Sequence, residues 1–182
     1  KDVQMRNETG DQFIYGNPKR FHDGYFSLLT QIEAGITGKC WADEFFVSAS
    51  YSKTDKELQT GSVQTKVYGM AERNSDAWNV SARYNKQNFI TEGLTLKATL
   101  SHTWDHSITI DTAYRKYYWD GGYIVSQRNE IRGNEPSIRH YKRPLTIARA
   151  NLDYRLGEHH GLNLNYHMNR TGNDRYDDLD QS

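Results

Sequence analysis

The sequence contains no run of about 18 apolar residues, the length that a membrane-spanning helix requires. It has one cysteine, Cys40, which excludes an internal disulfide framework and a multi-cysteine zinc site. Its 23 Lys and Arg balance 23 Asp and Glu, so no basic surplus points to nucleic acid as a partner. No nucleophile elbow, phosphate loop or metal-ligand spacing occurs, which predicts a protein without catalytic residues, cofactor or bound metal.

Aromatic residues are abundant although the chain is polar. Aromatics make up 13% of the residues, whereas the apolar fraction is 36% and the mean hydropathy is −0.91. Disordered chains are poor in aromatic residues, so this composition favours a folded β-protein.

Period-2 alternation of apolar and polar residues is the main structural signal. It recurs in six segments: 25–36, 45–53, 77–86, 94–104, 146–156 and 162–169. Successive side chains of a strand point to opposite faces, so each segment predicts a strand with one apolar and one polar face. On the apolar face, Lys53 and Lys86 occur only at strand ends, where a long side chain can reach water. The polar face is expected to face a lumen, through charged residues that include Arg83, Lys97, Arg149, Asp153 and Arg155.

The connections alternate between short and long. Segments 37–44, 87–93 and 157–161 are short, whereas surface loops are expected at about 54–76 and 105–145. Outer-membrane β-barrels have short periplasmic turns and longer outer loops. Most segments have roughly the 9–11 residues that a tilted strand needs to cross the hydrocarbon layer. The pattern therefore predicts an all-β fold, with antiparallel up-and-down strands that form part of a transmembrane β-barrel.

Aromatic residues near both strand ends favour the same interpretation, because membrane barrels carry two aromatic girdles. The expected outer girdle contains Tyr51, Trp78, Trp104 and Tyr166. The expected inner girdle contains Phe45, Tyr84, Phe89 and Tyr154. A soluble antiparallel sandwich would also alternate, but it explains neither the girdles nor the rhythm of loop lengths.

Six strands are fewer than the eight of the smallest known membrane barrels. An open sheet in lipid would leave edge N–H and C=O groups unpaired. The chain also opens on Lys1-Asp2-Val3 without a signal peptide. We therefore expect residues 1–182 to be one partial barrel segment, with loop-like ends at 1–24 and 170–182.

Several stretches resemble TonB-dependent outer-membrane receptors of the Bacteroides type. These are 35–56, 66–69, 78–85, 94–104 and 114–121, within a similarity that runs over most of 24–178. The resemblance implies a plugged barrel of about 22 strands in the bacterial outer membrane. It implies import of a metal chelate, vitamin or glycan, driven by the TonB complex through the plug. The implied partners are outer-membrane lipid, the remaining strands and the plug. The resemblance assigns no ligand-binding residues.

An aromatic cluster in the longest expected loop is the best candidate for ligand contact, because binding residues favour long loops on a rigid scaffold. It contains Tyr114, Tyr117, Tyr118, Trp119 and Tyr123. These rings could stack on a sugar or an aromatic chelate, or they could pack the loop against its neighbours.

Two polar clusters are weaker candidates. His102 and His106 flank a strand end, where their spacing does not bring them together as it would on a helix. Acidic residues between Asp174 and Asp180 lack the spacing of a calcium loop and fit a solvated loop better. The remaining interpretations are a passive porin or adhesin barrel, and a soluble β-domain that binds carbohydrate through the Tyr/Trp loop.

Overall fold

The computed structural model describes residues 3–6, 12–133 and 135–180. Within these ranges the chain is all-β and antiparallel, as the alternation predicted, and it contains no helix. Accordingly, the described residues include no helix of the length and apolarity needed to cross a membrane.

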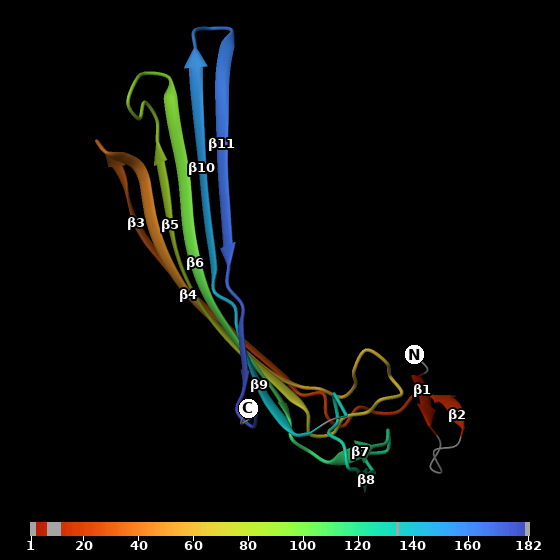
Figure 1. Cartoon of the computed structure of the whole chain (residues 1–182). Coiled ribbons are helices and arrows are strands. Elements are labelled where there is room, and N and C mark those ends of the chain that lie inside the picture. The colour runs from red at the N-terminus through yellow and green to blue at the C-terminus, as the bar shows by residue number, and fades with distance from the viewer. Residues whose placement is uncertain (1–2, 7–11, 134, 181–182) are drawn as a thin grey trace.

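Six long strands form one sheet (Figure 1). They are β3 (Tyr25–Lys39), β4 (Ala42–Glu57), β5 (Glu72–Lys86), β6 (Leu94–Asp111), β10 (Leu145–Leu156) and β11 (His160–Thr171). Their order in the sheet, β3-β4-β5-β6-β10-β11, follows their order in the chain, which is an up-and-down arrangement. Each of the six predicted segments lies within one of these strands. The described sheet is open, with β3 and β11 as its edges.

Two shorter strands continue the sheet at one end. β9 (Ser137–Lys142) pairs with β6, and β12 (Asp174–Asp177) pairs with β9. Pro144 separates β9 from β10, because proline has no N–H to donate to the ladder. The Gly172 N–H donates to the Pro144 carbonyl at 2.8 Å, so the two halves of this ribbon remain connected.

The strands run further than the sequence predicted. The expected loops 54–76 and 105–145 contain the end of β4, the start of β5, the end of β6 and all of β9. β4 extends four residues past Lys53 through Thr54 and three charged side chains, where both faces meet water and no apolar pattern marks the strand. Backbone pairing of Glu57 with Glu72 nevertheless continues the ladder to that point.

Short strands also occur in the remaining expected loops. β1 (Val3–Arg6) pairs with β2 (Phe13–Gly16) inside 1–24, and β12 lies inside 170–182. β7 (Arg115–Tyr117) pairs with β8 (Tyr123–Val125) inside the longest loop. The alternation did not predict these short strands inside the loop-like ends and the long loop, because strands of three or four residues are too short to show a period. Residues 1–2, 7–11 and 181–182 lie outside the described part of the chain.

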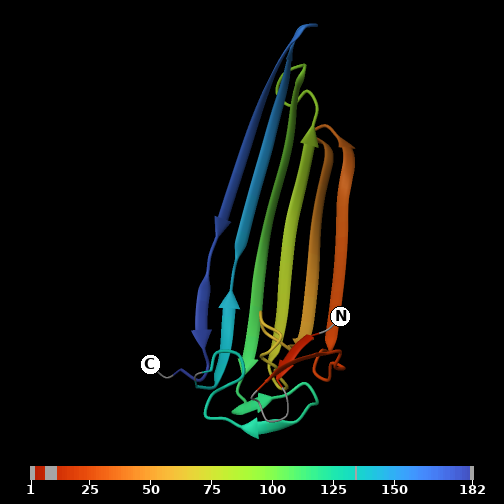
Figure 2. The ribbon, with the colours of Figure 1, turned by 90° about the vertical axis from the view of Figure 1, so that its right-hand side faces the viewer.

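Strand register places the apolar residues on one common face. One row crosses all six strands through Ala34, Val47, Ala82, Leu100, Ala148 and Met168. Residues directly opposite in an antiparallel pair lie on the same face, so this row is continuous. No described segment covers it: Leu100 is 53% exposed, Leu164 61% and Ile32 71%. Figure 2 shows the six strands side by side without a second layer over their upper halves.

The small buried core lies outside this sheet, in the loops. Val67, Tyr117 and Trp119 are buried together, and Val3 and Met5 pack against them. The loops gather at one end of the sheet, to one side of it (Figure 1). Asp111 and Ser137, at polar-face positions of β6 and β9, are buried there. The loops therefore cover the polar face and leave the apolar face open.

Candidate ligand-binding loops

Asp111, the last residue of β6, anchors the longest loop. Its buried carboxylate accepts hydrogen bonds from three consecutive N–H groups, those of Glu130 (2.9 Å), Ile131 (3.1 Å) and Arg132 (3.3 Å). Burial raises the pKa of this carboxyl above its ordinary value, although the bonds from Ile131 and Glu130 act in the opposite direction. The segment 130–132 is thereby fixed beside the end of β6.

Glu130 also accepts hydrogen bonds from three consecutive N–H groups, and it connects the longest loop to the loop 58–71. Its buried carboxylate accepts from the N–H groups of Gly69 (3.3 Å), Met70 (3.1 Å) and Ala71 (2.9 Å). Burial raises the pKa of Glu130, and the bonds from Met70, Gly69 and Ala71 oppose that shift. Asp111 and Glu130 therefore connect β6, the loop 112–136 and the loop 58–71 in series.

Gln59 joins a third segment to this package. Its side-chain oxygen accepts from the N–H groups of Phe21 (2.9 Å) and His22 (2.8 Å), and its amide nitrogen donates to the Tyr68 carbonyl at 3.2 Å. A ring nitrogen of His22 lies 2.9 Å from the Ala71 carbonyl oxygen. We call the structure formed by residues 20–24, 58–71, 112–133 and 135–136 the loop package.

The five aromatic candidates do not form one stacking surface. Tyr117 and Trp119 are each 9% exposed, and Trp119 donates its indole N–H to the Gln64 carbonyl at 3.1 Å. These two rings pack the loops together. Tyr118 is half-buried, whereas Tyr114 and Tyr123 are exposed. Ligand contact by the exposed rings stays a prediction.

A hollow of about 290 Å³ lies in the loop package. Five of its lining residues are cationic: Lys66, Arg115, Lys116, Arg128 and Arg132. The only acidic residue among its lining residues is Glu130, whose carboxylate already accepts the three N–H groups described above. We call it the basic hollow.

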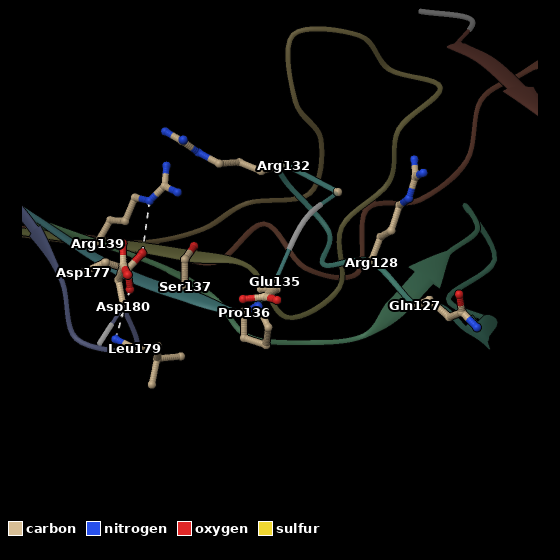
Figure 3. Close-up of a pocket in the computed structure, with 11 residues that line it drawn as sticks. Gln127, Arg128, Arg132, Glu135, Pro136, Ser137, Arg139, Asp177, Leu179 and Asp180 are labelled. Atoms are coloured by element: carbon tan, nitrogen blue, oxygen red, sulfur yellow. Dashed lines mark hydrogen bonds and ion pairs between the residues drawn. The ribbon is translucent and has the colours of Figure 1, made fainter. Parts of the chain in front are cut away.

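A larger and more open hollow, of about 1180 Å³, shares Arg128 and Arg132 with the basic hollow. It adds Arg139, which forms an ion pair with Asp177 at 3.2 Å. In Figure 3 the three arginine side chains extend to the upper side of the view, and a dashed line joins Arg139 to Asp177. The Nη1 atom of Arg139 is buried and has no hydrogen-bond partner within the described ranges.

The charged residues predicted for the polar face lie on one face of the sheet. The register places Arg83, Thr99 and Arg149 in one row, and Lys97 and Asp153 alternate with it on the same side. Arg155 follows at the same parity in β10. Arg83 lies 3.5 Å from Glu33 and 5.0 Å above the Phe46 ring centroid. That these residues face a lumen stays a prediction.

His102 and His106 have separate partners, and His140 connects His106 to the acidic segment 174–180. His102 bonds to Thr146 at 2.7 Å, whereas His106 bonds to His140 at 3.0 Å. His140 in turn bonds to Asp178 at 2.9 Å. No group of three or more His, Cys, Asp or Glu that could hold a metal ion occurs in the part of the chain that the structure describes.

No protein family, curated protein or solved structure matches this chain.

The sequence pattern missed the residues that build the loop package. Asp111, Glu130 and Gln59 are single polar residues without a motif, and their partners lie 9 to 61 positions away. Arg128 and Arg132 gave no signal either, because their neighbours in the basic hollow come from three separate loop segments.

Proposed function

We propose that this chain is part of the wall and outer loops of a TonB-dependent outer-membrane transporter, which imports a scarce nutrient into the periplasm. The single observation that carries this proposal is the exposed apolar face of the six-stranded sheet, together with loops that cover only the opposite, polar face. Soluble proteins rarely expose a contiguous apolar surface of this extent. Lipid is the occupant that we assign to it.

Aromatic side chains border this apolar face at its outer end. Tyr51 and Trp78 are paired across strands with ring centroids 4.7 Å apart, and Trp78 pairs with Trp104. The next row outward on the same face is polar and rich in charge: Lys53, Asp76, His106, Lys142 and Asp174. An apolar band, then aromatics, then charges is the sequence of layers that a lipid bilayer favours.

Aromatic residues border the opposite end as well. The Tyr84 hydroxyl donates to the Trp41 carbonyl at 2.6 Å, and the ring centroids of Tyr84 and Phe89 are 6.3 Å apart. Tyr166, expected at the outer end, instead shares a row with Tyr84 through Ala98 and Ala150. β10 and β11 are shifted along the sheet relative to β4, a stagger that tilted barrel strands require.

The open edges support incorporation into a larger barrel. β3 and β11 each leave one row of backbone N–H and C=O groups without a strand partner in the described sheet. In lipid each unpaired group costs several kcal/mol, so further strands of the same receptor would pair with both edges. The plug and its coupling to the TonB complex rest on the family resemblance alone.

Neighbouring substitutions on opposite faces test the lipid assignment. Leu100→Arg puts a charge in the middle of the apolar face, and Ser101→Arg puts one on the polar face. In lipid the first costs about 2–4 kcal/mol and the second little, so vesicle binding should weaken about 30-fold or more for Leu100→Arg only. Flotation with phosphatidylcholine vesicles measures this binding.

A soluble sheet predicts a different outcome for the two substitutions. Leu100 is already 53% exposed, so a soluble sheet would accept arginine at either position. Equal behaviour of the two variants, or a chain that stays monomeric in buffer and ignores vesicles, would contradict the membrane proposal. Detection of a plug domain in the same polypeptide would separate a transporter from a passive porin or adhesin.

A further inference from the structure

Five cationic side chains line the basic hollow, which is a high density of positive charge for so small a space. Elsewhere, Lys86 pairs with Asp43 at 2.9 Å and Arg143 with Asp105 at 3.1 Å. Within the described ranges, none of the five cations that line the basic hollow forms an ion pair. The chain is neutral as a whole, so positive charge is concentrated here.

Two of these five cations are held by neutral groups. The Lys66 ammonium donates to the Ile131 carbonyl at 2.5 Å, and Arg115 donates to the Tyr117 hydroxyl at 3.2 Å. Both charges are held in position by these bonds, and neither forms an ion pair within the described residues. The side chains of Lys116, Arg128 and Arg132 are exposed, and among the described residues no carboxylate pairs with them.

The buried carboxylates of Glu130 and Asp111 offset only part of this charge, through Arg115 and Lys66. Glu130 lies 3% exposed beneath it and is used by the backbone of 69–71. A concave wall with charge of one sign focuses the electrostatic potential and concentrates counter-ions. In the adjoining hollow, Arg139 Nη1 is a buried donor without a partner in the described structure. This N–H group is therefore available to an acceptor atom of a ligand.

We propose that the basic hollow binds a small solute that carries carboxylate or phosphate groups, with Arg128 and Arg132 as its main contacts. The guanidinium fork matches the two oxygens of either group. A volume of about 290 Å³ is close to the lower end of the range for small-molecule sites. Val67 and Tyr117 supply an apolar wall for the carbon skeleton.

This inference deepens the proposed import function by naming the charge class of the solute, and it rests on that function only for the role in transport. The loops cover the polar face, away from the face assigned to lipid. A dissolved solute therefore reaches the hollow, whereas a lipid headgroup at the apolar face does not.

Citrate and inorganic phosphate are suitable probes, titrated calorimetrically into the full chain in a non-ionic detergent at low ionic strength. Removing both charges with Arg128→Gln/Arg132→Gln should raise the citrate Kd about tenfold or more, because each substitution removes a charge-assisted contact. The matched control Arg149→Gln/Arg155→Gln removes the same charge from the polar face of β10. It should leave the Kd within about twofold.

Three results would overturn the inference: no binding of either probe, no effect of the hollow substitutions, or equal weakening by both double variants. Hydrogen exchange at 130–132 verifies that the loop package remains folded, and Lys116→Gln provides a milder variant if it does not. Vesicle flotation reports separately on the membrane proposal. Citrate binding without vesicle binding would leave the anion site intact and reject the transporter, and the reverse result would reject only the anion site.

Discussion

At the scale of single residues, two buried carboxylates hold the loops in place. Asp111 and Glu130 each accept three consecutive backbone N–H groups, a concave arrangement that suits an anion. A buried N–H that loses its acceptor costs about 1–3 kcal/mol. The loop package therefore depends on few atoms, and it can be opened without altering the sheet.

Replacement of Asp111 by alanine should release the segment 130–132. Three N–H groups would lose their acceptor, so amide exchange there should accelerate about tenfold or more, while exchange in β5 stays unchanged. Asp105→Ala is the control, because Asp105 forms a more exposed ion pair with Arg143, of a kind that contributes little. Similar exchange in both variants would contradict the anchoring role.

Acidification should act in opposite directions on two carboxylates. Burial raises the pKa of Asp177, but bonds from the Ile138 and Leu179 N–H groups and from Arg139 lower it more, and the net pKa lies below its ordinary value. Its stabilisation is therefore present above the unfolded pKa and is lost as pH falls through the folded pKa. The pKa of Asp111 is raised, so its contribution instead falls as pH rises through the folded value.

Hydrogen exchange between about pH 7 and pH 3, corrected for intrinsic rates, measures the difference. Protection of the Ile138 amide, bonded to Asp177 at 2.9 Å, should fall on acidification. Protection of the Ile131 amide, bonded to Asp111 at 3.1 Å, should not fall with it. Asp177→Asn should abolish the pH dependence at Ile138, and its persistence would assign the effect to another group.

At the scale of strands, β3 and β4 are matched through a glycine. Gly35 lies opposite Phe46, which lies opposite Arg83 in the same row. A Cβ at Gly35 would meet the Phe45 carbonyl oxygen and the Phe46 ring. The missing side chain allows the ring to lie over the backbone, and Arg83 then covers the ring.

Gly35→Val should disturb this stack. The added side chain would displace Phe46 and weaken its contact with Arg83, at a cost of about 1–3 kcal/mol in the free energy of unfolding. Gly161→Val in β11 is the matched control, because a Cβ there meets only the Tyr154 carbonyl oxygen at an ordinary 3.7 Å. Urea midpoints in detergent provide the comparison, and equal midpoints would mean that the Phe46 ring moves without cost.

Strands were predictable from sequence only where their two faces differ. The central parts of β3 to β6, β10 and β11 alternate because one face is apolar, and the register follows the same alternation. From Thr54 to Glu57 both faces meet water, so the ladder continues without a pattern. The basic hollow could not be predicted for another reason. Lys66 and Arg132 line the same hollow only because the Asp111 and Glu130 contacts hold their loops together.

At the scale of the whole molecule, neutral charge and low mean hydropathy conceal a strong separation of surfaces. One face is apolar, the other is polar, and the positive potential is concentrated in the loops over the polar face. An apolar surface open to water favours association, and unpaired edge strands offer backbone groups to other chains. The same face that we assign to lipid should therefore drive self-association when lipid is absent.

Paired lysines on the two edge strands test this consequence. Ile32 and Leu164 are 71% and 61% exposed on the apolar face. Ile32→Lys/Leu164→Lys should shift the chain toward monomer in detergent-free sedimentation, because it charges the associating surface, and should also weaken vesicle binding. Gln31→Lys/Asn163→Lys changes the polar face of the same strands and should do neither. If both pairs shift sedimentation alike, backbone pairing at the edges rather than the apolar face drives association. Lipid would then no longer be the best-supported occupant of that face.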